Sequence, residues 1–244
     1  MRPIEYHKLD QVEHLMSWFR GLHGNLVATF LRRHSKRPHG VILDAGCGTG
    51  GFLCTLAQAL PQYALLGLDV NKTACEIAHV KSGQFVCLGS ANSLPFSDAC
   101  FAAIFSADVL CHSGVDQKQA LKNFHRCLQS GGILVLNLPA YSWLLSGHDR
   151  AVHNVRRYTS KNIRALLMAA GFIDIETTYW NTILFPLMVL HRMLSSKIDE
   201  SDVRLYAKPM ETICRTIMRF ETFILSRGFN LPFGGSIIAT AIKK

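Results

Sequence analysis

The sequence predicts an α/β fold in which a parallel sheet is covered by helices on both faces, and three observations support this. Between residues 40 and 140, strand-like and helix-like segments alternate about every 20–30 residues. The strand-like segments are apolar throughout, which is typical of strands buried on both faces. The chain has 244 residues, 49% of them hydrophobic and 18% charged, so it can bury a sizeable core and is not a disordered chain. Its length indicates one domain, or one domain with an appendage.

The first expected element is a helix over residues 9–34, with a break near Gly21 and Gly24, because apolar residues recur there at helical spacing. A polar, basic linker over 34–40 follows. Further along the chain, strands are expected within 40–50, 63–70, 84–90, 100–110, 133–139, 172–180 and 236–242, and helices over 52–60, 71–82, 116–129, 160–172 and 208–227. Asn71 is a plausible N-cap, and Gly131 with Gly132 is expected to end the helix over 116–129.

Charge and cysteine content narrow the functional classes. The net charge of +9 suggests an anionic partner, but residues 41–140 carry only −1, whereas residues 1–40 carry +4 and residues 141–244 carry +6. The eight cysteines form no C-x-x-C pair, so a disulfide framework or zinc site is not expected, and a reducing cytoplasm fits. No secretory signal is seen at the N-terminus. The apolar run 177–191 is too short to span a membrane, although it could lie on one.

The strongest candidate site is the segment Asp44-Ala45-Gly46-Cys47-Gly48-Thr49-Gly50, which directly follows the first apolar strand. Its glycines allow a ligand to approach the backbone, and the next helix presents its N-terminus there. Asp69 ends the second strand, where a carboxylate can accept both hydroxyls of a ribose. The spacing is not that of a dinucleotide fingerprint or a Walker A loop, and a carboxylate at position 44 suits a cationic group better than a pyrophosphate.

With these residues, the sequence resembles the class I S-adenosylmethionine-dependent methyltransferases, whose first motif is a strand followed by D-x-G-x-G-x-G. Segments 89–98, 101–104, 109–112 and 126–132 resemble later motifs of that family. The resemblance implies a Rossmann-like, doubly wound seven-stranded sheet, mostly parallel with the last strand antiparallel, and S-adenosyl-L-methionine as cofactor. The cofactor-binding residues it implies are Arg20, Asp44, Gly46, Cys47, Gly48, Gly50, Asp69, Val70, Ser90, Ala91 and Ser106.

Two positions depart from the family pattern. Ser90 stands where an acidic residue is usual, and Ala102 stands where an aspartate is usual. The loss of a charged acceptor at Ser90 is expected to weaken cofactor binding by about 1–2 kcal/mol. A non-catalytic, cofactor-binding partner subunit is therefore one alternative reading.

The flanks are expected to build the acceptor site. The resemblance implies a helical lid over residues 1–39 and a methyltransferase domain over 40–244, with acceptor-side insertions at 141–158 and 179–233. The candidate acceptor-contacting residues are Trp18, Phe19, Tyr141, Trp143, His153, Arg156, Arg157 and Tyr158. A structural alternative is open at two points: Arg156 or Arg157 pairs with Asp149, and the aromatic residues are ordinary packing residues.

The expected reaction is in-line SN2 transfer of a methyl group to O, N or activated C of a small, acidic or amphipathic metabolite, as in biosynthetic small-molecule methylation. His148 is the first candidate for a general base and His112 the second, and no metal is required. A nucleic-acid methyltransferase is the other alternative, although no N/D-P-P-Y/F motif supports it. A cytoplasmic protein with a peripheral membrane contact is compatible with the sequence, and the oligomeric state is open.

Overall fold

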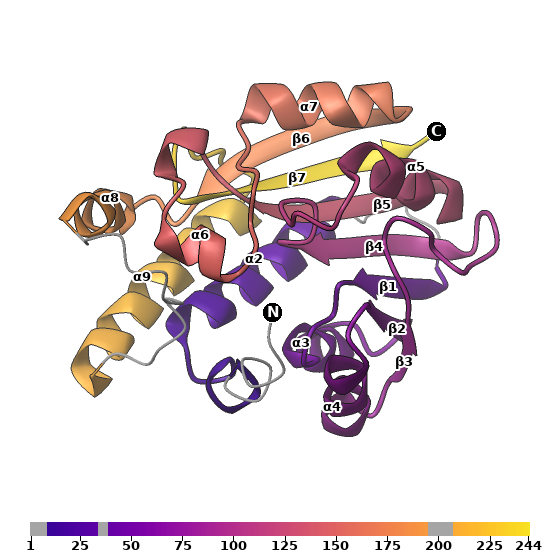
Figure 1. Cartoon of the computed structure of the whole chain (residues 1–244), viewed down its shortest axis with the longest axis horizontal. Helices are drawn as coiled ribbons and strands as arrows, with labels where there is room; N and C mark the ends of the chain where they lie inside the picture. The colour runs from indigo at the N-terminus through magenta and orange to yellow at the C-terminus, as the bar shows by residue number, and fades with distance from the viewer. Residues whose placement is uncertain (1–8, 34–38, 195–206) are drawn as a thin grey trace.

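The computed structural model describes residues 9–33, 39–194 and 207–244, and these form one seven-stranded sheet flanked by helices (Figure 1). The strand order is β3-β2-β1-β4-β5-β7-β6. The strands are β1 Val41–Ala45, β2 Ala64–Asp69, β3 Phe85–Leu88, β4 Phe101–Ala107, β5 Leu128–Pro139, β6 Phe172–Trp180 and β7 Ser236–Lys243. Strands β1 to β5 run parallel, while β7 is antiparallel to β5 and β6. The expected doubly wound sheet with an antiparallel last strand is confirmed.

Helices cover both faces of the sheet, as expected (Figure 1). They are α2 Ser17–Arg33, α3 Gly51–Ala59, α4 Lys72–Ser82, α5 Gln117–Cys127, α6 Gly147–Ala151, α7 Ser160–Ala169, α8 Phe185–Leu194 and α9 Lys208–Ser226, with a short 3-10 turn at Ser142–Leu144. On one face, α5 and α7 bury Phe124 and Ile163 in one apolar cluster that includes residues of β4, β5 and β7. On the other face, α2, α3 and α9 bury Phe30, Leu56 and Met218. Each buried aliphatic or aromatic side chain contributes about 1.5–3 kcal/mol.

The N-terminal helix breaks at a different place from the one expected. Residues 9–12 are helical, residues 13–15 turn, and α2 then runs unbroken through Gly21 and Gly24. Both glycines face α9: a Cβ added at Gly21 would lie 3.0 Å from the Cβ of Met218. Their small size therefore serves the close approach of two helices. Residues 1–8 and 34–38, which belong to the expected lid and linker, lie outside the described residues.

Helix ends are set by local hydrogen bonds. The Asn71 side chain accepts from Ala74 N at 3.0 Å, and Thr159 caps α7 in a capping box. The expected end of α5 at Gly131 and Gly132 is wrong, because α5 ends at Cys127 and β5 begins at the next residue. The short helix α6 and the helix α8 were not expected as separate elements. The part of the expected insertion at 195–206 lies outside the described residues.

Candidate active site

The glycine loop between β1 and α3 is closed on two sides and open on a third. Gly46, Gly48 and Gly50 have φ of 90°, 52° and 85°, values that favour glycine. A Cβ at Gly46 would lie 2.1 Å from Cγ2 of Val109, and one at Gly50 would lie 2.8 Å from Cα of Ala78. A Cβ at Gly48 would meet nothing within 4 Å. The loop therefore packs into the protein through its outer glycines and presents Gly48 to open space.

Asp69, at the end of β2, holds this loop in place. Its carboxylate accepts from the amide of Gly48 at 3.0 Å and from the amide of Asn71 at 2.9 Å, and the residue is buried. Each ionised carboxylate offers about four lone-pair sites, so two remain for another donor. The residue expected to bind a ribose thus also links the loop to the start of α4.

Asp44, near the end of β1, is a buried carboxyl group. The residue is 2% exposed, and its Oδ2 atom has no hydrogen-bond partner among the residues that the structure describes. Burial, followed by the nearby Asp69 and Glu13 carboxylates, raises the pKa of Asp44 to about 8. Because a buried carboxylate without a partner is costly, its position points to a cationic ligand.

Glu13 is a third carboxylate at this loop, and it was not among the expected site residues. It accepts from the Thr49 hydroxyl at 2.8 Å, ion-pairs with Lys81, and lies directly over Cα of Gly51. Lys81 also pairs with Asp10. The residues before α2 are therefore attached to the glycine loop through buried charge. The sequence signal that could have pointed to Glu13 is its place five residues before the aromatic pair Trp18-Phe19 in the N-terminal segment.

The other expected cofactor-binding residues differ in their exposure and in their hydrogen bonds. Val70 is exposed, and Ser90 is partly buried, with its Oγ accepting from Asn92 N at 3.2 Å. Ala91 is buried within the same turn. The Arg20 side chain donates from Nε to the carbonyl of His14 at 2.9 Å and is exposed.

Two of the expected contacts require correction. The Ser106 hydroxyl is 1% exposed and donates to the carbonyl of Ala45 at 2.9 Å, so it joins β4 to β1 inside the sheet. Cys47 is buried, and burial raises the pKa of its thiol well above the usual range. Its side chain is therefore a neutral, packed group, and only its backbone lies at the loop.

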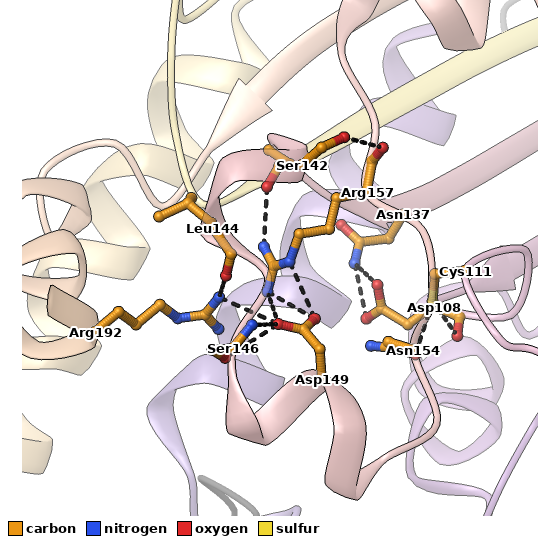
Figure 2. A network of polar contacts seen from close by, with 11 residues as sticks. Asp108, Cys111, Asn137, Ser142, Leu144, Ser146, Asp149, Asn154, Arg157 and Arg192 are labelled. Carbon is orange, nitrogen blue, oxygen red and sulfur yellow. Dashed lines mark hydrogen bonds and ion pairs between the residues drawn. The ribbon is translucent and has the colours of Figure 1, made fainter. Parts of the chain in front are cut away.

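The segment over 141–158 is organised by a buried ion pair (Figure 2). Arg157 donates to both carboxylate oxygens of Asp149, at 3.0 and 2.9 Å, and to the carbonyl of Ala140 at 2.9 Å. Arg192 of α8 lies 3.6 Å from the same carboxylate. Burial alone would raise the pKa of Asp149, but the Arg157 and Arg192 charges hold it below its usual value. The guanidinium N–H groups of Arg157 are therefore used within the protein rather than toward an acceptor. This agrees with the alternative in which Arg157 pairs with Asp149.

Arg156 and Tyr158 also have internal partners. The Tyr158 hydroxyl is buried and lies 2.9 Å from both the carbonyl of Leu110 and Oε1 of Gln117. Arg156 donates to the carbonyls of Leu110 and His112, at 3.2 and 2.7 Å. Tyr158 is thus mostly buried, with its hydroxyl used inside the protein. Arg156 is partly exposed, and it lines an open pocket of about 540 Å³ beside α7 together with Arg157 and Tyr158.

The three histidines proposed for the acceptor side lie in different settings. His112 pairs through its backbone with Asn154, and burial lowers the pKa of its ring, which keeps it neutral. His153 is exposed, with φ of 60°. His148 lies within α6, but its side chain is outside the described part of the structure.

Aromatic residues form two groups at this edge of the sheet. Tyr141 stacks on Tyr179, with ring centroids 5.3 Å apart and planes at 7°. Trp143 also stacks on Tyr141, with ring centroids 5.9 Å apart. Trp143 is 63% exposed. Trp18 packs against the buried Trp180 at 5.7 Å and against Phe19 at 4.9 Å. The first group offers an open aromatic surface, whereas the second joins α2 to the core.

A polar trio at this edge was missed by the sequence analysis. Nδ2 of Asn137 donates to both carboxylate oxygens of Asp108, at 3.1 and 3.0 Å (Figure 2). Nε1 of Trp180 donates to Oδ1 of Asn137 at 2.7 Å. Asn137 and Trp180 are fully buried. A polar residue inside the apolar run 133–139 was the available signal. Its partners are 29 and 43 residues away in sequence, so the pattern did not reveal them.

Two searches of the described residues bear on cofactors and membranes. Among those residues, no group of three or more His, Cys, Asp or Glu side chains is arranged to hold a metal ion. Within the same part of the chain, no helix has the length and apolar character required to cross a membrane.

Comparison with known proteins identifies the domain. Residues 43–136 match the family model described as a methyltransferase domain. Malonyl-[acyl-carrier protein] O-methyltransferase of Herminiimonas arsenicoxydans is 34% identical over 142 residues, covering 58% of this chain and 52% of that protein. A probable tRNA methyltransferase 9B of Bos taurus is 32% identical over 117 residues, covering 47% of this chain and 24% of that protein. The chain thus spans about half or less of these curated relatives.

Solved structures show the same fold over nearly the whole chain. A SAM-dependent methyltransferase of Thermotoga maritima, described as a possible histamine N-methyltransferase, covers 98% of this chain and 99% of its own, with a TM-score of 0.56 and 20% identity. Phosphoethanolamine N-methyltransferase 2 of Haemonchus contortus, in complex with S-adenosyl-L-methionine, covers 89% of this chain and 52% of its own, with a TM-score of 0.59 and 17% identity. Residues 43–136 are therefore similar to methyltransferase domains, and the fold of the chain is that of solved methyltransferase structures.

Proposed function

We propose that the protein transfers a methyl group from S-adenosyl-L-methionine to a small-molecule acceptor. The observation that carries this proposal is the buried Asp44 carboxyl group, which directly precedes the glycine loop in the chain and has an oxygen without a partner among the described residues. The donor carries positive charge on its sulfonium and amino groups, so its charge complements this site. The remaining lone pairs of Asp69 suit the two ribose hydroxyls.

The donor supplies an electrophilic methyl group, so the protein's task is binding, orientation and exclusion of water. Asp44 would hold the cationic part of the cofactor, while Asp69 and the Gly48 amide would fix the ribose end of the loop. Glu13 and Trp18 attach the N-terminal residues over this region, which supports their role as a lid. Ser90 would contact the adenine with a neutral hydroxyl.

The acceptor is proposed to be a small, amphipathic molecule. The relatives named above include one that acts on a malonyl-acyl carrier protein, and the exposed Trp143 on Tyr141 offers an apolar contact surface at the same edge of the sheet. An acidic acceptor has less support than the sequence suggested, because Arg157 is committed to Asp149. Arg156 remains as a partly exposed cation.

A peripheral contact with an anionic membrane is proposed for the outer face of α8 and α9. Apolar side chains there are about half exposed: Leu187, Leu190, Ile213, Phe220 and Phe223. The two acidic residues of α9, Glu211 and Glu221, point inward and accept backbone hydrogen bonds, so Arg219 and other basic residues set the charge outside. An amphipathic helix with an apolar and a basic face suits a membrane surface. Flotation with vesicles of neutral or 30–40% anionic phospholipid tests this, and equal binding to both would contradict it.

The test of the main proposal uses S-adenosyl-L-methionine with a radiolabelled methyl group and a whole-cell extract. After incubation, the extract is separated into small molecules, lipids, protein and RNA, and label is expected in the small-molecule or lipid fraction. Label in RNA would favour the nucleic-acid alternative that the tRNA methyltransferase relative raises. Tight donor binding with no label in any fraction would favour a non-catalytic subunit.

A further inference from the structure

Two carboxylates near the 141–158 segment have opposite surroundings (Figure 2). Asp149 accepts from Arg157 and from the backbone and hydroxyl of Ser146, and its lowered pKa marks it as a permanent anion. Asp108 accepts hydrogen bonds to its side chain only from Asn137 within the part of the chain that the structure describes. Carboxylates whose surroundings move their pKa values apart commonly divide structural and chemical roles. Asp149 is the structural member of this pair.

Asp108 lies where a reacting group would be useful. It directly follows β4, at the edge of the sheet that collects ligands in open α/β folds. The next residue, Val109, packs on Gly46 of the glycine loop. Asp108 is therefore placed between the loop that the cofactor would occupy and the segment that carries Asp149. Its φ of 54° is a left-handed conformation that a non-glycine residue adopts at a cost of about 1–2 kcal/mol.

The orientation of Asp108 is fixed by two further residues. The indole of Trp180 can only donate, so it fixes Oδ1 of Asn137 toward itself. The amide NH2 of Asn137 must then face Asp108, and it donates to both carboxylate oxygens. This chain of contacts crosses β4, β5 and β6. A neutral amide that holds a carboxylate by one edge leaves the other edge available to a donor from outside.

We propose that Asp108 contacts the nucleophilic group of the acceptor and accepts its O–H or N–H hydrogen, with Asn137 as its positioning residue. This rests on the proposed methyl transfer. In the step, the acceptor's oxygen or nitrogen forms the new bond to the methyl carbon. The methyl–sulfur bond breaks with its electron pair left on sulfur, and the proton passes to the Asp108 carboxylate. The acceptor class is thus an alcohol, phenol, amine or acid that carries a transferable hydrogen, rather than a carbon nucleophile.

The charged and titratable groups around Asp108 give this step a defined pH dependence. Burial raises the pKa of Asp108 to about 7, while Asn137 and Arg157 lower it and Asp149 raises it. The nearby thiol of Cys111 has its pKa raised further by burial and stays neutral. The pKa of Asp149 is held below its usual value by Arg157 and Arg192, so Asp149 stays ionised at neutral pH. Asp108 is therefore the group in this set that titrates near pH 7, and methyl transfer is expected to decline as the pH falls through that value.

The test compares wild-type protein with Asp108→Asn, which keeps the shape but cannot accept a proton. The probe is labelled S-adenosyl-L-methionine with the low-molecular-mass fraction of a cell extract, and the readouts are initial rate and donor affinity. Asp108→Asn is expected to lower the rate about 10²–10⁴-fold while the donor Kd changes less than threefold. If wild-type protein forms product and Asp108→Asn forms it at the same rate, this inference is overturned while the proposed function stands. No wild-type product, despite donor binding, overturns the proposed function and this inference together.

A second variant separates positioning from a merely structural role. Asn137→Ala removes a hydrogen bond that lowers the pKa of Asp108, so the acid limb of the rate–pH profile is expected to move to higher pH. Asn123→Ala is the matched control, because Asn123 is another buried asparagine, and in the described part of the chain its amide donates to the backbone carbonyls of Ala91 and Asn92. Its profile is expected to keep the wild-type midpoint. An Asn137→Ala protein that is folded and has an unmoved acid limb would overturn the assignment.

Discussion

The affinity for S-adenosyl-L-methionine is expected to rise with pH, because the site contains a carboxylate that is mostly protonated when empty. The perturbation is Asp44→Asn, which removes the ionisable group and keeps its size. Asp44 has a pKa of about 8, compared with 3.8 for an exposed aspartate. The cationic donor binds the ionised form better, so binding releases a proton, and the affinity of wild-type protein increases as the pH rises toward 8.

The size of the effect follows from that pKa. At pH 7, one unit below it, about 90% of the carboxyl groups are protonated, and ionising them costs about 1.4 kcal/mol, a tenfold factor in Kd. At pH 9 the cost is nearly absent. Wild-type Kd is therefore expected to fall about tenfold between pH 7 and pH 9. The Asp44→Asn Kd should lack this change and be weaker at pH 9.

The assay is isothermal titration calorimetry with the donor at several pH values, repeated in two buffers of different ionisation enthalpy to count the released proton. The amino group of the donor itself titrates in this range, but it does so for every variant and cancels in the ratio to Asp44→Asn. Asp98→Asn is the matched control, because Asp98 is 76% exposed and pairs with Arg126 at the surface. A wild-type curve parallel to that of Asp44→Asn, with no proton released, would refute the reasoning.

Three further outcomes are expected. Glu13→Gln should lower the pH at which donor affinity levels off, since the Glu13 charge helps to raise the pKa of Asp44; calorimetry that shows an unchanged midpoint would contradict this. In urea unfolding, Gly46→Ala should lose clearly more stability than Gly48→Ala, because both strain the backbone by about 1–2 kcal/mol but only the first meets a neighbouring side chain, and equal losses would count against it. Arg157→Ala should cost about 3–5 kcal/mol by leaving a buried anion, and a loss below 1 kcal/mol would show that the pair is unimportant.

The cofactor half of the molecule could be predicted because its signals are local. Strands β1 and β4 are mostly apolar and buried, a composition that is typical of strands covered on both faces, and glycines follow β1 directly. The Asp44 to Gly50 loop is contiguous in sequence, so its residues are neighbours before folding. The N-cap at Asn71 is local for the same reason.

The acceptor side could be predicted only in part, because its contacts join distant residues. Residue spacing alone left open whether Arg157 contacts an acceptor or pairs with Asp149. In the fold, both side chains are buried and form an ion pair. The role of Gly21 depended on a helix almost 200 residues later, so its small size was read as a break rather than a contact. The role of Asn137 becomes visible only in the folded chain, where Asp108 lies at its amide nitrogen and Trp180 at its amide oxygen.

The position of β7 has a consequence for synthesis on the ribosome. This strand follows β6 in the chain but inserts between β5 and β6, so neither neighbour can reach its final pairing until residues 236–243 have left the exit tunnel. Until then, β5 presents an unpaired apolar edge, which is a site for misassociation between nascent chains. The helix α2 also cannot complete its packing until α9 has been synthesised, because Gly21 and Gly24 of α2 pack against α9. Completion of the sheet is therefore expected to follow synthesis of β7, and an excess of a peptide with the β7 sequence is expected to compete for the β5 edge during refolding.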